Sequence, residues 1–350
     1  MDKKQALGIR IRKRHAEAIR KILVENNLLC GDFKIIKNKN FIYFPVKKIP
    51  NETNNIKIET VKREFEKKEK TVNSYKDLLS LPKELEAELP TSYDVIGDII
   101  LLKLPKNLLK YKKEIGESLL QANKNINVVC LVEPVTGELR TRNVEILAGE
   151  ERTTTAHTEY GVKFDIDIRK TYFSPRLATE RKHVSTLVKP NEIVVDMFSG
   201  IAPFSIMIAK YANPKIIFAV DKNKDAVAYA RENIRKNKLL DKIEVIHTDA
   251  KNIPKILSKR NIKADRIIMN LPFSAHLFFS NALSIAADEC IIHYYDILKE
   301  DNIQERLDKL KSIAKGNNWT LSQIDVRKIK TYAPREFYIG IDIRATKMPM

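Results

Sequence analysis

Four polar residues close four apolar runs in the C-terminal half of the 350-residue chain. Asp196, Asp221 and Asp249 close the first three runs, and Asn270 closes the fourth. Because parallel strands end at one edge of a doubly wound α/β sheet, we expect these side chains to face one crevice. Carboxylates and an amide at such a crevice can hydrogen-bond a ribose and hold a base. Asp221 alone would also suit an ordinary helix N-cap before Lys224, but four polar strand ends together favour a binding site.

The first of these runs leads into a turn of small residues. Residues 192–203 read EIVVDMFSGIAP, which predicts a buried strand, a turn at Gly200 and a helix from Phe204 onward. Asp221 follows the glycine by about 20 residues, where a carboxylate can accept hydrogen bonds from both ribose hydroxyls. The turn lacks the GxGxxG triplet through which a pyrophosphate approaches. A phosphate-free nucleoside such as S-adenosylmethionine therefore fits better than a dinucleotide.

The fourth run ends in a turn that reads Asn270-Leu271-Pro272-Phe273. Proline fixes φ and removes an N–H, and it holds the residue before it extended. The amide of the asparagine is thereby presented at a rigid strand end. Methyltransferases that act on ring or exocyclic nitrogens of bases use an Asn-x-Pro-aromatic turn to hold the target nitrogen. From this motif alone, an ordinary strand-ending turn is an equally good interpretation.

The charge of the chain indicates a partner that carries phosphates. Lys and Arg outnumber Asp and Glu by 63 to 45, which gives a net charge of +18. Residues 1–70 hold 19 of the basic residues against 9 acidic ones. Each phosphate that a basic side chain neutralises releases counterions, so this excess favours nucleic acid. A Lys-rich surface of purely compositional origin is the alternative.

The same inventory argues against several other classes of protein. Cys30, Cys130 and Cys290 are too widely spaced to predict a zinc cluster or a disulfide framework, and we expect no metal. No apolar run approaches the roughly 18 residues of a membrane span. The N-terminus has charges but no apolar signal region, so we expect a cytoplasmic protein.

The N-terminal fifth of the chain reads as a small basic α/β module over residues 1–50. A helical period covers residues 15–29, and residues 34–47 predict a hairpin that turns at Lys39-Asn40. Residues 51–75 lack a sizeable apolar face. They predict a linker or, in their second half, an exposed helix.

Two further domains follow. The middle one, residues 76–168, predicts a strand over 94–104, a helix over 106–122 and a hairpin over 153–168. In residues 169–350, five apolar runs alternate with helical runs, and two last strands face each other across a short gap. This pattern predicts an α/β fold with a mostly parallel seven-stranded sheet whose last two strands form an antiparallel pair. One of the helical runs covers 274–288.

Five motifs together resemble the archaeal and eukaryotic tRNA (guanine-N1)-methyltransferases, which act on guanosine 37 beside the anticodon. They are DMFSGIAPFSI, the NLP turn, FSPRLATER (Phe173–Arg181), GELRTR and TYAPREF (Thr331–Phe337). The resemblance covers nearly the whole chain. It implies a Rossmann-like class I methyltransferase domain preceded by two smaller α+β RNA-binding domains, of which the middle one binds the anticodon stem-loop and the first touches the tRNA elbow. The family usually has a second glycine where Ala202 stands.

The resemblance also assigns roles to individual residues. It implies that Glu180 is the general base that removes the N1 proton of guanine, and that Arg140 stabilises negative charge on O6. The guanine would be held by Asn270 and Pro272 and stacked on Tyr172, with Arg142 and Phe273 as further substrate contacts. The cofactor S-adenosylmethionine would contact Arg181, Asp196, Gly200, Asp221, Lys222, Asn223, Asp249, Ala250 and Asn270. Without the resemblance, Glu180 and Arg181 read as an exposed charged pair at a helix start, and Arg140 as one of many phosphate-contacting arginines.

The resulting expectation is a monomeric S-adenosylmethionine-dependent methyltransferase of N1 of guanosine 37 in tRNA. One alternative is a wyosine-pathway transferase, which would move the aminocarboxypropyl group of the same cofactor or methylate the wyosine precursor. A non-catalytic RNA-binding protein with a vestigial nucleoside fold is a second alternative.

Overall fold

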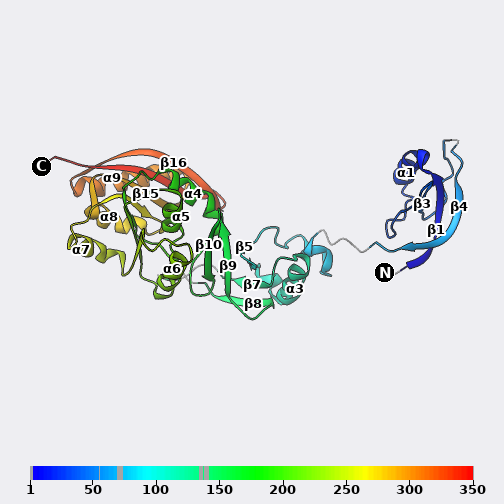
Figure 1. Cartoon of the computed structure of the whole chain (residues 1–350), viewed down its shortest axis with the longest axis horizontal. Coiled ribbons are helices and arrows are strands. Elements are labelled where there is room, and N and C mark those ends of the chain that lie inside the picture. Colours follow the sequence, from blue (N-terminus) through cyan, green and yellow to red (C-terminus); the bar gives the residue numbers. More distant parts are fainter. Residues whose placement is uncertain (1–2, 55, 69–73, 134–136, 138–141, 350) are drawn as a thin grey trace. The chain divides into compact units, whose positions relative to one another are not determined.

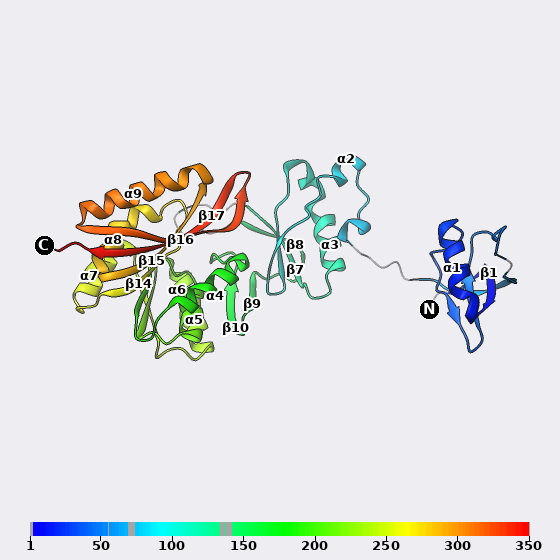
Figure 2. The same ribbon diagram turned by 90° about the horizontal axis from the view of Figure 1, so that it is seen from above.

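The computed structural model describes residues 3–54, 56–68, 74–133, 137 and 142–349 (Figures 1 and 2). The chain forms two compact units, Met1–Leu78 and Leu79–Met350. None of the helices in the described ranges has the length and apolarity needed to cross a membrane. Each unit has its own core and is described by itself.

The N-terminal unit is a four-stranded antiparallel sheet with one helix. The strand order is β2-β3-β1-β4, and Ile9, Ile19, Leu23 and Phe44 form much of the core. The predicted helix and hairpin are both confirmed, and the first strand was not predicted. The elements are β1 (Lys3–Arg12), α1 (Ala16–Glu25), β2 (Ile36–Lys37), β3 (Phe41–Pro45) and β4 (Glu59–Glu66).

The interpretation of residues 51–75 as a linker or exposed helix is wrong for residues 59–66. This segment is β4, and it pairs with β1 over eight residue pairs from Lys3↔Glu66 to Arg10↔Glu59. The sequence does not predict this strand, because Phe65 is its one fully buried side chain and its apolar residues do not alternate regularly. Gly8 on β1 leaves room for that ring, since a Cβ there would lie 2.6 Å from it.

Phe65→Ala should destabilise the N-terminal unit by about 3–5 kcal/mol, because it removes a fully buried ring from a small core. Hydrogen exchange should speed up across β1, β3 and β4 and stay unchanged in residues 79–350. Glu64→Ala, which changes the exposed neighbour, is the matched control. Equal protection in both variants would show that residues 59–66 behave as a linker.

The middle part of the chain forms a four-stranded sheet with strand order β5-β6-β7-β8. The single strand expected over 94–104 is instead a hairpin, because Gly97 turns the chain with φ +57°. A side chain at Gly97 would collide with Thr155 and Ala156, so the turn requires glycine. The elements are β5 (Asp94–Ile96), β6 (Ile99–Leu102), α3 (Lys112–Ala122), β7 (Val128–Val132) and β8 (Val144–Gly149), with a one-turn helix α2 (Lys83–Glu86) before them.

A second hairpin, β9 (Thr154–Glu159) and β10 (Val162–Asp167), confirms the one expected over 153–168. It packs on α6 (Lys224–Lys236), where Asn233 bonds the backbone N–H and C=O of Asp165 at 2.7 and 3.1 Å. It also reaches the middle sheet, because the Gly97 N–H donates to His157 Nδ1 at 3.0 Å. The hairpin therefore joins the middle sheet to the C-terminal one.

The C-terminal sheet has seven strands in the order β13-β12-β11-β14-β15-β17-β16. Adjacent strands pair in parallel from β13 to β15, and β17 runs antiparallel to both of its neighbours. This confirms the predicted α/β fold with a mostly parallel seven-stranded sheet. The strands are β11 (Ile193–Asp196), β12 (Ile216–Asp221), β13 (Ile243–His247), β14 (Ala264–Met269), β15 (Ala286–Lys299), β16 (Trp319–Ala333) and β17 (Glu336–Lys347).

Helices cover both faces of this sheet (Figures 1 and 2). One apolar cluster contains side chains of α4 (Ala178–Leu187), α5 (Pro203–Tyr211) and α6, and the other contains those of α7 (Ile253–Ser258), α8 (Phe279–Ile285) and α9 (Ile303–Gly316). The helix expected over 274–288 ends at Ile285, because β15 begins at the next residue.

The turn after β11 keeps a left-handed backbone at two residues. Gly200 has φ +54°, and Ala202, fully buried, has φ +64°. An L-residue in this conformation costs about 1–2 kcal/mol, which explains why the family usually has glycine there. The turn forms nevertheless, since Ala202 N–H donates to Ser199 O at 2.8 Å and Ser199 N–H to Val220 O at 2.8 Å.

Candidate active site

The strand-end residues of β11, β12 and β13 lie together, as their positions in the sequence predicted. Asp221 is the centre of this group: its two carboxylate oxygens accept hydrogen bonds from the N–H groups of Gly200 and Asn223 at 2.7 and 2.8 Å. Its backbone carbonyl accepts from Thr248 N–H at 3.1 Å, beside Asp249. Burial raises the pKa of Asp221 above its usual range.

Asp196 lies at the end of β11 and is almost fully buried. Ser205 donates to its Oδ2 at 2.9 Å, whereas its Oδ1 and the hydroxyl of Ser199 are buried without a hydrogen-bond partner among the described residues. Burial, reinforced by the charge of Asp221, raises the pKa of Asp196 to about 7. Unpaired buried polar atoms at a strand-end crevice fit a polar nucleoside, since an unpaired polar group is otherwise costly.

Two residues expected to contact the cofactor also have structural roles. Asn223 caps α6: its side-chain oxygen accepts from Asp225 N–H at 3.0 Å, and its amide donates to Lys170 O at 3.0 Å. The interpretation of Asp221 as the helix cap is therefore wrong. The guanidinium of Arg181 is buried against Glu159 at 2.5 and 2.9 Å and also donates to a backbone carbonyl.

The ion pair of Arg181 with Glu159 fastens α4 to the β9–β10 hairpin, and the Arg181 side chain is 2% exposed. Burial alone would raise the pKa of Glu159, but the hydrogen bond from His157 and the charge of Arg181 lower it overall. The expected cofactor contact of Arg181 stays a prediction.

The other expected cofactor residues lie beside Asp221. Lys222 follows it directly, and its carbonyl lies 3.2 Å from a ring nitrogen of His247. Asp249 accepts from Lys251 N–H at 2.9 Å, and the buried Ala250 begins a short 3₁₀ helix there.

The NLPF turn is rigid, as expected, and its asparagine is held by a tyrosine that was not foreseen. Tyr338 of β17 donates to the side-chain oxygen of Asn270, and Pro272 is buried. Phe273 has φ +71°, and its N–H donates to the buried Asp296 at 2.8 Å, which stabilises this uncommon conformation. The Phe273 ring is 50% exposed and meets Tyr332 edge-on at 5.8 Å.

Glu180 lies in the first turn of α4 and is buried, 6% exposed. Its Oε1 accepts hydrogen bonds from Tyr295 at 2.8 Å and from Arg327 Nη2 at 2.9 Å. The interpretation of Glu180 and Arg181 as an exposed charged pair is therefore wrong. The two side chains are buried against different partners.

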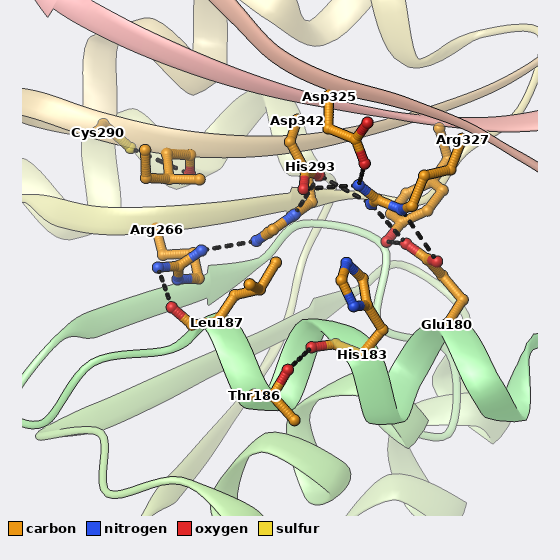
Figure 3. A network of polar contacts seen from close by, with 12 residues as sticks. Glu180, His183, Thr186, Leu187, Arg266, Cys290, His293, Asp325, Arg327 and Asp342 are labelled. Atoms are coloured by element: carbon orange, nitrogen blue, oxygen red, sulfur yellow. Dashed lines mark hydrogen bonds and ion pairs between the residues drawn. The ribbon is translucent and has the colours of Figure 1, made fainter.

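A chain of polar contacts continues from this carboxylate into the sheet (Figure 3). Arg327 donates to both oxygens of Asp342 at 2.8 and 3.0 Å, and Asp342 lies 2.7 Å from His293 Nδ1. His293 Nε2 lies 2.8 Å from Arg266 Nη1, which can only donate, so the histidine proton is on Nδ1. Burial lowers the pKa of His293. Burial alone would raise that of Asp342, but its bonds to His293 and Arg327 lower it overall.

The expected substrate residues lie on segments next to this site. Tyr172 follows β10, and its carbonyl oxygen lies 3.8 Å from the position of a Cβ on Gly200. The guanidinium of Arg142 lies 5.3 Å from the centre of the Tyr172 ring. Arg140 lies outside the described residues.

Four residues of this network were not predicted: Tyr295, Arg327, Tyr338 and Asp342. A signal exists for Asp342, because the apolar run of β17 reads YIGIDI and a charged residue inside a buried strand requires a partner. What could not be read from the sequence is which partner it finds, because the pairing depends on strand register.

Comparison with known proteins identifies the family. Three family models match: the "TRM5/TYW2 methyltransferase domain" over residues 155–322, the "TYW2 N-terminal domain" over 75–153 and the "tRNA methyltransferase 5 N-terminal domain" over 8–54. The tRNA (guanine(37)-N(1))-methyltransferases Trm5b of Pyrococcus abyssi and Methanocaldococcus jannaschii are each 37% identical, over 97% of this chain and 99% of the relative. The chain belongs to the tRNA (guanine37-N1)-methyltransferase family.

Solved structures agree with this assignment. Trm5b of Pyrococcus abyssi has a TM-score of 0.75 at 37% identity, and the Trm5 of a complex with tRNALeu has 0.80 at 38%. In both cases the match covers 97% of this chain and 99% of the other. Methanocaldococcus jannaschii Trm5 in complex with adenosine has 0.66 at 35%, over 98% and 100%.

This family depends on S-adenosylmethionine, and the strand-end crevice fits it. The carboxylates of Asp221 and Asp249 suit the hydroxyl and amino groups of a nucleoside, and the unpaired Asp196 Oδ1 suits a donor. The left-handed turn at Gly200 brings backbone close to the same place. Within the described residues, no group of His, Cys, Asp and Glu side chains could hold a metal ion.

Asp196→Asn should remove a pH dependence of stability. The folded pKa of about 7 lies above the value near 4 of an unfolded aspartate, so its stabilising contribution is complete below about pH 4 and is lost as the pH rises through about 7. Relative to wild type, the free energy of unfolding of Asp196→Asn should therefore rise by roughly a few kcal/mol between about pH 4 and about pH 7. Denaturant titrations would measure it.

Asp288→Asn, at an exposed position on the same sheet, is the matched control and should show no such trend. A pH-independent difference between Asp196→Asn and wild type would contradict the assignment.

Proposed function

We propose that this chain transfers a methyl group from S-adenosylmethionine to N1 of guanosine 37 in tRNA. The observation that carries the proposal is the convergence of Glu180 and Asn270 through two tyrosines of neighbouring strands. Tyr295 donates to Glu180 and Tyr338 to Asn270, and the two tyrosine rings lie 6.2 Å apart. Two adjacent tyrosines thus link the proposed proton acceptor to the amide proposed to hold the purine.

The chemistry requires both groups. Guanine N1 carries a proton, so it must lose that proton as it attacks a methyl group. The carboxylate of Glu180 is the proton acceptor, and the Asn270 amide and Pro272 hold the edge of the base. When bound, the cofactor supplies a methyl group already activated by its sulfonium. Arg140 is placed by resemblance at O6, where its charge would stabilise the developing anion.

Tyr172, Arg142 and Phe273 complete the proposed acceptor site. The ring of Tyr172 suits stacking on an unpaired base, and the guanidinium over it adds positive charge. The half-exposed ring of Phe273 can contact the base or its neighbour.

The smaller domains would position the tRNA. We assign the middle domain to the anticodon stem-loop and residues 3–68 to the elbow, and we place the border of the methyltransferase domain between residues 153 and 155, as the family models divide it. The N-terminal unit supports the assignment, because four basic side chains and one tyrosine line a groove that also contains Glu64 and Glu66. They are Lys3, Arg10, Tyr43, Lys62 and Arg63. Arg63 lies over Tyr43 at 4.2 Å, an arrangement suited to phosphate and base.

A monomer in the cytoplasm is part of the same proposal. Light scattering of the tRNA complex would test the oligomeric state, because a monomer gives a complex with the mass of one chain and one tRNA. Fractionation of the source cells would test the localisation.

Mass mapping of transcript tRNAs after incubation with S-adenosylmethionine tests the reaction. The wild-type transcript should gain a methyl group on N1 of guanosine 37. A transcript with adenosine at position 37 is the control and should gain none there. A methyl group at another position, or none in wild-type tRNA, would contradict the proposal.

The same experiment distinguishes the proposed reaction from the wyosine-pathway alternative. A tRNA(Phe) (4-demethylwyosine(37)-C(7)) aminocarboxypropyltransferase of Methanocaldococcus jannaschii is 35% identical, but over 72% of this chain, whereas the Trm5b relatives cover 97%. An added aminocarboxypropyl group has a different mass from a methyl group. Equilibrium dialysis with labelled cofactor tests the non-catalytic alternative. Binding of S-adenosylmethionine to the chain would exclude an RNA-binding protein with a vestigial nucleoside fold.

Glu180→Gln and Arg140→Ala should each lower the single-turnover rate of methyl transfer at least about tenfold, because one removes the proton acceptor and the other the charge at O6. Filter binding should show tRNA affinity nearly intact. Glu305→Gln, on the exposed face of α9, is the control and should keep the wild-type rate. Full activity in both variants would remove these two roles.

A further inference from the structure

We propose that Arg327 is a positioning residue for the base: it fixes the carboxylate of Glu180 so that one oxygen faces the substrate. The inference rests on the proposed function, in which Glu180 accepts the N1 proton. Arg327 lies on β16 and Glu180 on α4, 147 residues away in sequence. Their contact joins the helix that carries the base to the last hairpin of the sheet.

The two oxygens of Glu180 are bonded unequally. Oε1 accepts from Tyr295 at 2.8 Å and from Arg327 Nη2 at 2.9 Å. Among the described residues, Oε2 has one contact, 3.5 Å from Arg327 Nε. Because Oε1 is bonded twice and Oε2 only weakly, Oε2 is the oxygen left to accept a proton from the substrate.

Strand register determines which groups surround the carboxylate of Glu180. Tyr295 of β15 and Arg327 of β16 are both direct partners of Gly340 on the strand between them, β17. A Cβ on Gly340 would lie 3.4 Å from Glu180 Oε1 and 3.1 Å from the Tyr295 ring. Side by side on the three strands therefore lie the Tyr295 hydroxyl, the Gly340 backbone and the Arg327 guanidinium. Because glycine has no side chain, the carboxylate of Glu180 can approach β17.

The arginine is itself held in place. Asp342 accepts two hydrogen bonds from its guanidinium, and Asp325 a third at 2.6 Å. Asp342 is bonded in turn to the fully buried His293 (Figure 3). Such a network restricts the rotation of Arg327, and so of the carboxylate that it bonds.

Arg327 also supplies the positive charge that the buried carboxylate requires. The titratable groups packed against Glu180 come from three strands: Tyr295 of β15, Arg327 of β16 and, behind the arginine, Asp342 of β17. On α4 itself, Arg181 turns toward Glu159. Loss of the Arg327 charge would therefore leave Glu180 facing a tyrosine and a second carboxylate.

Arg327→Gln tests the role in single-turnover methyl transfer with the full-length chain and transcript tRNA. The rate should fall at least about tenfold. Cofactor affinity by equilibrium dialysis should stay nearly unchanged. Arg327→Lys, which keeps the charge, should restore part of the rate. Arg344→Gln, at an exposed position of β17, is the control.

A double variant separates this inference from the proposed function. If Arg327 acts through Glu180, Arg327→Gln combined with Glu180→Gln should be no slower than Glu180→Gln alone. Independent, multiplying losses would overturn the positioning role, as would a wild-type rate in Arg327→Gln or the absence of any rescue by Arg327→Lys. Failure of the function itself would be seen differently, as no methyl group on guanosine 37 with the wild-type chain.

Gly340→Ala provides a second route if Arg327→Gln does not fold. It keeps every charge but places a methyl group against Glu180 and Tyr295. The rate should fall while cofactor affinity stays unchanged. A folded Gly340→Ala protein with the wild-type rate would contradict the proposed surroundings of the carboxylate.

Discussion

A carboxylate buried in a protein must be compensated by charge or hydrogen bonds, and this requirement organises the acceptor half of the site. Removing one partner of a buried ion pair typically costs about 3–5 kcal/mol, because the other charge is left unpaired. α4 carries two consecutive buried charges of opposite sign, Glu180 and Arg181. The first is compensated by β15 and β16, the second by Glu159 of the β9–β10 hairpin. The helix is therefore fastened on two sides, and the position of the base depends on both.

The strand-end half of the site could be predicted because it follows from the sheet alone. Parallel strands end at one edge whatever their neighbours, so the meeting of Asp196, Asp221 and Asp249 needed only correct strand ends. The structural roles of Arg181 and Asn223 could not be predicted in this way. Both lie beside site residues in the sequence. Their structural roles become visible only from their partners in three dimensions, which are Glu159 for Arg181 and the N-terminus of α6 for Asn223.

Local pattern also failed where a strand has little apolar surface or a turn is brief. β4 buries one aromatic ring on a strand that is mostly charged, so its sequence predicts a linker. Its pairing with β1 joins residues that lie far apart in the sequence. The run over 94–104 is apolar on both sides of Gly97, and a two-residue turn does not interrupt an apolar period. The parallel sheet was easier to predict, because β11, β12 and β14 are mostly buried and long helical runs separate the strands.

The antiparallel strand β17 explains why the acceptor site lies where it does. Side chains alternate along a strand, so Tyr338, Gly340 and Asp342 share one face. Along that face they give, in order, a donor to Asn270, a gap for Glu180 and an acceptor for Arg327. A shift in register by one residue would turn all three away at once. Base, purine-holding amide and positioning arginine thus depend on one pairing register, which couples the correct closure of the sheet to the geometry of catalysis.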